Sequence, residues 1–249
     1  MLSKRVIPVL LLKGEGLYKT QRFKDPKYVG DPLNAIKIFN DKEVDEICVL
    51  DIEASQKGKI NFELIERLAT ECFMPLSYGG GITNVSDANR LFKSGVEKII
   101  INGFNFISLD LINQLSQKYG NQAVIASVDV KQNLFGTYHV FKSNGKENTG
   151  IKPIDHIRKC IEAGAGEILL NNIDRDGMMN GIDIKLINEI EKSIEVPIIV
   201  CGGIGNIEHI KDVFEKTNVN AVAAGSMFVF HGKHRAVLIS YPNMSELIF

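Results

Sequence analysis

Four glycine-containing turns, each directly after a short apolar run, are the first candidates for chemistry in this sequence. Glycine lets a phosphate approach backbone N–H groups closely, and the start of a following helix adds a favourable dipole. Two turns lie in the first half of the chain and two in the second, which predicts two phosphate sites. The alternative is that these glycines only form tight turns. The residues concerned are Gly81, Asn102, Gly103, Gly203, Gly225 and Ser226.

Carboxylates follow several of the same apolar runs, and they could act as acids, bases or hydroxyl-binding groups. Asp129 is the first choice because it lies inside an apolar run, where a solvated turn role is least natural. Asp51 and Asp176 are further candidates, whereas Asp174 could instead brace the turn that it begins. Lys19 could close over an anion, or it could be an ordinary exposed lysine.

Four charged residues at the starts of apolar runs form a second candidate site. Arg5, Glu46, Lys98 and Glu167 open the first, second, fourth and sixth runs. Strand starts converge at one end of a barrel, so two positive and two negative side chains can form an alternating ring there. A structural salt-bridge plug explains this pattern. From the residues alone it is favoured over a gate on a path through the barrel.

The elements that must position these residues alternate regularly. Continuous apolar runs predict strands covered on both faces, at 6–12, 46–52, 74–80, 97–103, 123–130, 167–172, 197–203 and 220–226. Apolar residues at helical spacing lie between them, which favours a closed (β/α)8 TIM barrel over an open sheet. We expect residues 1–249 to form this single domain. A long polar loop is expected at 14–30 and a hairpin at 132–150.

The two halves of the sequence resemble each other, which predicts a half-barrel repeat about a pseudo-twofold axis. Residues 7–13 match 125–131, so that Leu11 aligns with Asp129, and residues 78–82 match 201–204. Residues 50–52 echo 173–175. A doubled half-barrel should have two related ligand sites.

Composition narrows the class of protein. The chain has 249 residues and a net charge of −1, which speaks against a nucleic-acid binder. Its four cysteines are scattered, which predicts free thiols in a reducing compartment. The run at 6–12 lacks a cleavage site and no run is long enough to span a membrane, so we expect a cytoplasmic protein. His231 and His234 have no carboxylate partner, and we expect neither a metal site nor a cofactor.

Segments distributed over nearly the whole chain, to about Phe228, show a family resemblance. They include VDEICVLDIEAS, YGGGI, EKIIING, QAVIASVDVK, SNGKENTG, GAGEILLNNIDRDG, PIIVCGGIG and AVAAGSMF. Together they resemble the cyclase subunit of imidazole glycerol phosphate synthase. The resemblance implies a barrel that binds a long bisphosphate ligand. It also implies a heterodimer in which a glutaminase subunit docks at the N-terminal face and sends ammonia through the barrel.

The resemblance also implies roles for individual positions. Asp129 would be one of two catalytic aspartates, Lys19 part of a closing loop, and Asp51 and Asp176 substrate-binding groups. The ring of charged residues matches the family's ammonia gate, which reverses the preference for a plain plug. The two phosphate sites would use Gly81, Asn102 and Gly103 at one end, and Gly177, Gly203, Gly225 and Ser226 at the other.

One departure from the family pattern concerns the first strand. The family has an aspartate there, in a pattern like Leu-Asp-Val-Lys, whereas residues 10–13 read Leu-Leu-Leu-Lys, with Leu11 at the position of the acid. Leucine cannot transfer a proton, and losing one member of an acid–base pair costs about a factor of 10²–10⁴ in rate. Ordinary cyclase turnover is therefore expected to be impaired, unless another carboxylate replaces the missing aspartate.

The C-terminal segment differs as well. Residues 230–242 resemble the tail of a paralogous branch in which the barrel and its glutaminase supply ammonia for amidation of a surface sugar. Three hypotheses for the function follow: a working cyclase for histidine synthesis, an ammonia-supplying paralogue, and a non-catalytic barrel that regulates the glutaminase. Leu11 counts against the first reading. The phosphate turns and Asp129 count against the third.

Overall fold

The computed structural model describes residues 3–232, 234–242 and 244–247, and in them eight parallel strands close into a barrel. The order around the barrel is β10-β11-β12-β1-β4-β5-β6-β7, and β7 pairs with β10 to complete the ring. Each predicted apolar run overlaps one barrel strand, which confirms the predicted TIM barrel. The strands are β1 (Arg5–Lys13), β4 (Ile47–Asp51), β5 (Leu76–Gly79), β6 (Lys98–Ile101), β7 (Val124–Gln132), β10 (Glu167–Asn172), β11 (Ile198–Cys201) and β12 (Ala221–Ala224).

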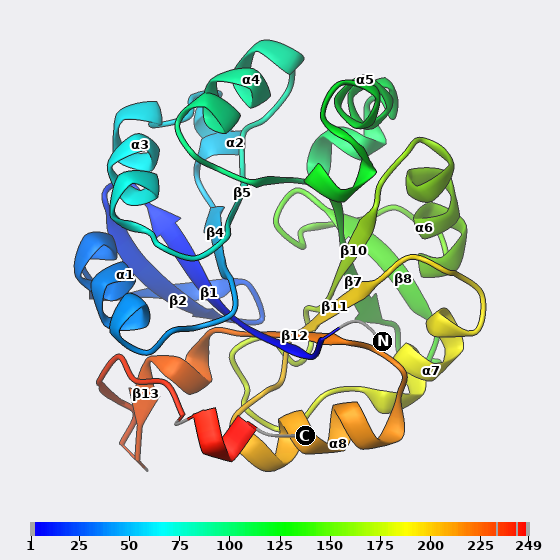
Figure 1. The fold of residues 1–249 in the computed structure, drawn as a ribbon. Coiled ribbons are helices and arrows are strands. Elements are labelled where there is room, and N and C mark those ends of the chain that lie inside the picture. Colours follow the sequence, from blue (N-terminus) through cyan, green and yellow to red (C-terminus); the bar gives the residue numbers. More distant parts are fainter. Residues whose placement is uncertain (1–2, 233, 243, 248–249) are drawn as a thin grey trace.

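Helices surround the barrel, as Figure 1 shows. Several begin at a side chain that accepts a hydrogen bond from the first turn, such as Asp31 before α1 and Asn206 before α8, which stabilises the helix start. The helices are α1 (Pro32–Asp41), α2 (Ala54–Lys57), α3 (Phe62–Glu71), α4 (Val85–Lys93), α5 (Asp110–Tyr119), α6 (Pro153–Glu162), α7 (Ile184–Glu191) and α8 (Ile207–Lys216). Short 3-10 turns are η1 (Gly103–Phe106), η2 (Asn121–Ala123), η3 (Ser226–Phe228) and η4 (Met244–Leu247).

The eighth strand–helix unit departs from the expected pattern. After β12 the described residues contain η3 and a small hairpin of β13 (Phe230–His231) and β14 (Ala236–Val237) instead of a long helix. Aromatic residues fill the place beside α1. Tyr241 packs 5.0 Å from Phe228 and 6.4 Å from Phe39, between ring centroids, and its hydroxyl donates to the Val6 carbonyl at 3.0 Å.

Two antiparallel hairpins extend from opposite sides of the barrel. The segment 14–30 forms β2 (Gly16–Gln21) and β3 (Lys24–Gly30), so the prediction of a polar loop is wrong. Its exposed residues at 24–28 hid the strand from a pattern search, whereas Leu17 is buried against the extended end of β1. The predicted hairpin at 132–150 is confirmed as β8 (Tyr138–Lys142), which pairs with β7, and β9 (Glu147–Asn148).

The strand register supports the half-barrel repeat and corrects one of its matches. On one side Leu11 of β1 pairs with Leu50 of β4, and on the other Asp129 of β7 pairs with Asn171 of β10. Leu50 therefore corresponds to Asn171, so the match of 50–52 with 173–175 was displaced by two residues. Since four strand steps separate β1 from β7, Leu11 and Asp129 face each other across the barrel.

Apolar side chains pack on both faces of the barrel sheet. Most lie between the strands and the helices, and a smaller cluster fills the barrel interior. The interior cluster consists of Ile7, Val9, Cys48, Ile100, Ile125, Leu169, Ile199, Ala221 and Ala223. It separates the two ends of the barrel, where the candidate functional residues lie.

Candidate active site

One large cavity of about 920 Å³ opens at the carboxyl ends of the barrel strands. Active sites of such barrels lie on this face. Its lining contains the predicted substrate-binding and catalytic positions and all of the glycine turns. These residues are Leu11, Lys19, Asp51, Asp129, Asp176, Gly81, Asn102, Gly103, Gly177, Gly203, Gly225 and Ser226.

The glycine turns adopt conformations that other residues tolerate poorly. Gly81 has a φ of +72°, and a Cβ there would lie 2.8 Å from the Cβ of Ala54. Gly203 has a φ of +115°, and its Cβ would lie 2.2 Å from the Gly181 carbonyl oxygen. Close packing by itself accounts for glycine at both positions. Their binding of phosphate stays a prediction.

Asp129 lies on a polar wall of the cavity. Its Oδ2 accepts a hydrogen bond of 2.7 Å from Asn102 Nδ2, which also lies 3.3 Å from Ser127 Oγ. The pKa of Asp129 is raised to about 7, mainly by burial and also by the charge of Asp176, and hydrogen bonds from Asn102 and Asn171 partly oppose this rise. A carboxyl group with this pKa can take up or release a proton near neutral pH.

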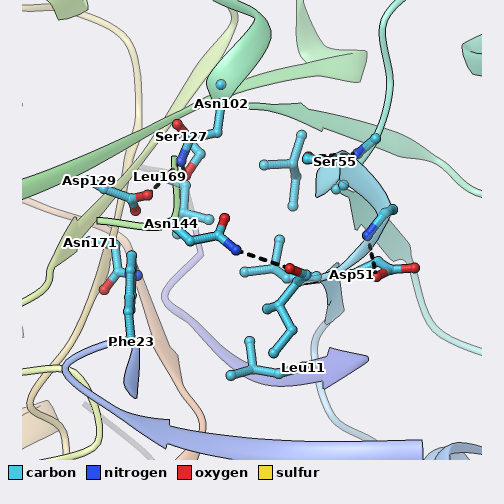
Figure 2. Close-up of a pocket in the computed structure, with 18 of the residues that line it drawn as sticks. Leu11, Phe23, Asp51, Ser55, Asn102, Ser127, Asp129, Asn144, Leu169 and Asn171 are labelled. Atoms are coloured by element: carbon cyan, nitrogen blue, oxygen red, sulfur yellow. Dashed lines mark hydrogen bonds between the residues drawn. The ribbon is translucent and has the colours of Figure 1, made fainter. Parts of the chain in front are cut away.

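The opposite wall is apolar. Leu11 and Leu50 line the cavity from β1 and β4, where the other half of the barrel presents Asp129 and Asn171. Figure 2 shows Leu11 on the far side of the cavity from Asp129. The cavity therefore has one buried carboxylate at the level of Leu11 and Asp129.

Lys19 is buried, so the alternative of an exposed lysine is wrong. Only 5% of the residue is exposed, and its Nζ donates a hydrogen bond to the Val9 carbonyl of β1. Burial lowers the pKa of Lys19 to about 8, against the charge of Asp176. A Cβ on Gly225 would lie 2.4 Å from Nζ, so the absence of a side chain at 225 makes room for the lysine.

Asp51 and Asp176 line the cavity but also brace its rim. Asp51 Oδ1 accepts hydrogen bonds of 2.9 Å from the backbone N–H groups of Glu53 and Ala54. Asp176 Oδ2 accepts from Thr20 Oγ1 at 2.9 Å and from the N–H of Phe23 at 3.4 Å. Burial raises the pKa of both aspartates. Their second oxygens remain the groups that a ligand could use.

The two hairpins cross over the cavity and meet. The β2–β3 hairpin reaches the loop after β10, where the Arg22 N–H donates to the Asp176 carbonyl at 2.9 Å. The second hairpin reaches the loop after β4, where Asn144 Nδ2 donates to the Ile52 carbonyl at 3.0 Å (Figure 2). At the meeting point a Cβ on Gly145 would lie 3.0 Å from the Phe23 ring. Residues of both hairpins therefore line one cavity.

The four charged residues form a closed ring at the opposite end of the barrel. Arg5 bonds Glu46 at 2.7 Å and also bonds Glu167, while Lys98 Nζ lies 3.1 Å from an oxygen of each glutamate. Both glutamates are buried. Glu46 Oε1 has no hydrogen-bond partner in the part of the chain that the structure describes. The geometry agrees with the predicted alternating ring and is compatible with a plug or a gate.

Three residues of the cavity were missed from the sequence. Phe23 and Asn144 belong to the hairpins, and the Asn144-Gly145 pair indicated only a turn. Asn171 follows three apolar residues inside β10, and a polar residue at a strand end is a signal that could have drawn attention to it.

Two other features are absent from the described ranges. No group of three or more His, Cys, Asp or Glu side chains there could hold a metal ion. No helix in those ranges combines the length and apolar character needed to cross a bilayer.

Comparisons with known proteins agree with this geometry. A family described as "Histidine biosynthesis protein" matches residues 5–235. A provisionally named imidazole glycerol phosphate synthase subunit, hisF2, of Pseudomonas aeruginosa is 52% identical over 99% of both chains. A provisionally named HisF subunit of Leptospira borgpetersenii is 49% identical over 99% of this chain and 98% of its own. Imidazole glycerol phosphate synthase subunit HisF of Lactococcus lactis subsp. cremoris is 40% identical over 92% of this chain and 89% of its own.

Proposed function

Because the chain belongs to the histidine biosynthesis protein family, we propose that it is an ammonia-handling barrel subunit of the imidazole glycerol phosphate synthase type. It would bind a bisphosphate ligand and work with a glutaminase partner. One observation carries this proposal. Both pairs of glycine turns and Asp129 line a single cavity, and the charged ring closes the other end of the same barrel.

The proposed path of ammonia runs along the barrel axis. A glutaminase docked at the N-terminal face would release ammonia beside the ring of Arg5, Glu46, Lys98 and Glu167. Beyond the ring lies the apolar interior cluster, which includes Ala221 and Ala223. Burying a charge in such surroundings is very costly, so neutral ammonia passes far more readily than ammonium. Asp129, with a pKa near 7, would meet it in the cavity.

The proposed ligand spans the cavity between the two sets of glycine turns. One phosphate would bind at Gly81, Asn102 and Gly103, and the other at Gly177, Gly203, Gly225 and Ser226. Lys19 would contribute positive charge beside Gly225, since a Cβ at 225 would lie 2.4 Å from its Nζ. Asp51 and Asp176 would hold polar groups of the ligand with their second oxygens.

The ring-closing step would be impaired. It needs an acid and a base on opposite sides of the ligand, and the side opposite Asp129 presents Leu11 and Leu50. This observation favours a second candidate function, in which the subunit passes ammonia to an enzyme that amidates a surface sugar. A barrel that only binds and regulates the glutaminase is the third possibility.

Reconstitution with the glutaminase tests the proposal. The full chain, its glutaminase, glutamine and the family's bisphosphate ribonucleotide are combined, and ammonia use and ring-closed product are measured separately. We expect glutamine hydrolysis to rise when the bisphosphate binds, with product formation more than tenfold slower than for an ordinary cyclase. Product within tenfold of an ordinary cyclase would establish histidine synthesis and refute the sugar-amidation candidate.

A matched binding measurement separates the remaining readings. Calorimetric titration with inorganic phosphate should detect phosphate binding at the glycine turns. Gly203→Ala should weaken this binding, because the new Cβ would collide with the Gly181 carbonyl. If the chain stimulates the glutaminase but binds no phosphate, the result would favour the third possibility, a barrel that only binds and regulates the glutaminase.

A further inference from the structure

The C-terminal hairpin of β13 and β14 is a part of the molecule to which the proposed function gives no role. Arg235 lies in the turn of this hairpin and is half-buried. Its guanidinium stacks on the Phe230 ring, 4.5 Å from the ring centroid. Both terminal nitrogens of the guanidinium donate to the Gly177 carbonyl oxygen at 3.2 Å. Through this side chain the C-terminal hairpin reaches the loop after β10.

The backbone at Arg235 indicates that its side chain serves a purpose. Its φ is +50°, in the left-handed region where glycine is favoured and a side chain is strained. Such residues persist where the surrounding structure holds them in place. The stacking on Phe230 and the paired hydrogen bonds to Gly177 are the contacts that hold Arg235 there.

The turn that Arg235 contacts is also the turn on which the β2–β3 hairpin docks. The Asp176 carbonyl accepts the Arg22 N–H at 2.9 Å, and Asp176 Oδ2 accepts from Thr20 Oγ1 at 2.9 Å. A Cβ on Gly177 would collide with the Thr20 carbonyl oxygen, so the turn packs directly against β2. The successive carbonyls of Asp176 and Gly177 are therefore held by two different hairpins.

The place of this turn affects Lys19, which precedes Thr20 on β2. The Nζ of Lys19 lies at the barrel mouth, where it donates to the Val9 carbonyl. The charge of Asp176 acts on the same ammonium group and opposes the lowering of its pKa by burial. A displacement of the turn would therefore change both the docking of β2 and the charge beside Lys19.

We infer that Arg235 is a positioning residue, which holds the turn after β10 where the β2–β3 hairpin docks and so keeps Lys19 in the cavity. A guanidinium suits this role because it can stack on an aromatic ring and present two donors to one carbonyl at the same time. The competing explanation is that Arg235 only fastens its own hairpin to the barrel. The contacts of Arg235 involve no ligand, so its role goes beyond the proposed function and does not depend on the phosphate sites.

Hydrogen exchange of the full chain, followed by mass spectrometry, tests the inference. Arg235→Gly is the main variant, because glycine removes the side chain and adopts the left-handed backbone without strain. We expect peptides covering residues 16–30 to exchange roughly tenfold faster than in the wild type, since the turn loses hydrogen bonds from a charged donor. Peptides covering α3, which lies away from this turn, should exchange within about twofold of the wild type.

Two further variants complete the exchange experiment. Arg235→Lys keeps the charge and one donor but loses the flat guanidinium, so peptides covering 16–30 should exchange at a rate between those of the wild type and Arg235→Gly. Arg158→Ala is the matched control, because Arg158 is exposed on α6 and its loss should leave the exchange of 16–30 unchanged.

A binding measurement tests whether Arg235 acts through Lys19. Calorimetric titration with inorganic phosphate should show affinity roughly fivefold weaker in Arg235→Gly than in the wild type. In a Lys19→Met background the same substitution should change the affinity by less than about twofold, because the group that Arg235 positions is already absent. A purely structural role would weaken binding equally in both backgrounds.

Each outcome supports or overturns the inference. If 16–30 exchanges at the wild-type rate in Arg235→Gly, or if only C-terminal peptides exchange faster, Arg235 fastens its own hairpin and the positioning role is refuted. An equal rise in all peptides, α3 included, would also refute it. If 16–30 alone exchanges faster but the wild type binds no phosphate, Arg235 positions the hairpin and the proposed phosphate sites fail.

Discussion

Replacing Asp129 with Asn should make the protein more stable above neutral pH while removing activity. The pKa of this buried carboxyl group is raised from 3.8 to about 7 because burial penalises its charge. Each unit of pKa corresponds to about 1.4 kcal/mol, so holding the ionised group in the folded state costs about 4 kcal/mol. Asn is uncharged at every pH and can still accept the hydrogen bond from Asn102.

The direction of the pH dependence follows from proton binding. Between pH 4 and pH 7 the folded protein keeps the Asp129 proton that the unfolded chain has released, so its stability falls as the pH rises. Above pH 7 both states are ionised and this contribution becomes constant. The stability advantage of Asp129→Asn should therefore grow by about 2 kcal/mol from pH 5 to pH 7, and then level off within about one further pH unit.

Urea unfolding at pH 5, 6, 7 and 8 measures this difference directly. Asp110→Asn is the matched control, since Asp110 is exposed on α5 and its replacement should change the free energy of unfolding by less than about 0.5 kcal/mol. A difference between Asp129→Asn and the wild type that stays the same at pH 5 and pH 8 would show that the carboxyl is well solvated. The assignment of Asp129 as a group that titrates near neutrality would then be lost.

Three further predictions concern other parts of the barrel. Leu11→Asp should raise ring-closing turnover by about 10- to 100-fold, measured with the reconstituted glutaminase, and no gain would locate the defect elsewhere. Arg5→Ala leaves both buried glutamates with Lys98 alone; it should lower the free energy of unfolding by about 3 kcal/mol and uncouple glutamine hydrolysis from ammonia use. Phosphate affinity should not change in this variant, and an equal loss of coupling and affinity would favour a structural plug. Asn144→Ala removes the hydrogen bond to Ile52 and should speed phosphate-ester dissociation by roughly threefold in stopped-flow, whereas an unchanged rate would mean that the second hairpin does not cover the ligand.

The sequence predicted the barrel well because its signals are local. Continuous apolar runs identified all eight strands, and charged residues at their starts identified a ring that closes only when distant strands meet. The alignment of Leu11 with Asp129 also came from local similarity, and the strand register agrees with it.

The parts that sequence reasoning missed depend on contacts between distant segments. The strand at 24–30 is mostly exposed and lacks an apolar alternation, so only its pairing with β2 reveals it. For Lys19 the sequence left open an anion-binding residue and an ordinary exposed lysine, and only the path of the β2–β3 hairpin shows that it is buried at the barrel mouth. That Asn171 Oδ1 has no hydrogen-bond partner among the described residues can be recognised only from the structure around it.

The meeting of the two hairpins has a consequence for the kinetics of release. Gly145 lies beside Phe23, since a Cβ at 145 would lie 3.0 Å from the Phe23 ring, and each hairpin donates a hydrogen bond to a loop of the opposite half-barrel. If one hairpin moved away, the other would lose a packing neighbour, so we expect the two hairpins to open together. A ligand bound beneath both hairpins would then dissociate in a single step. Its residence time would be set by one energy barrier, the joint opening of the hairpins, instead of two.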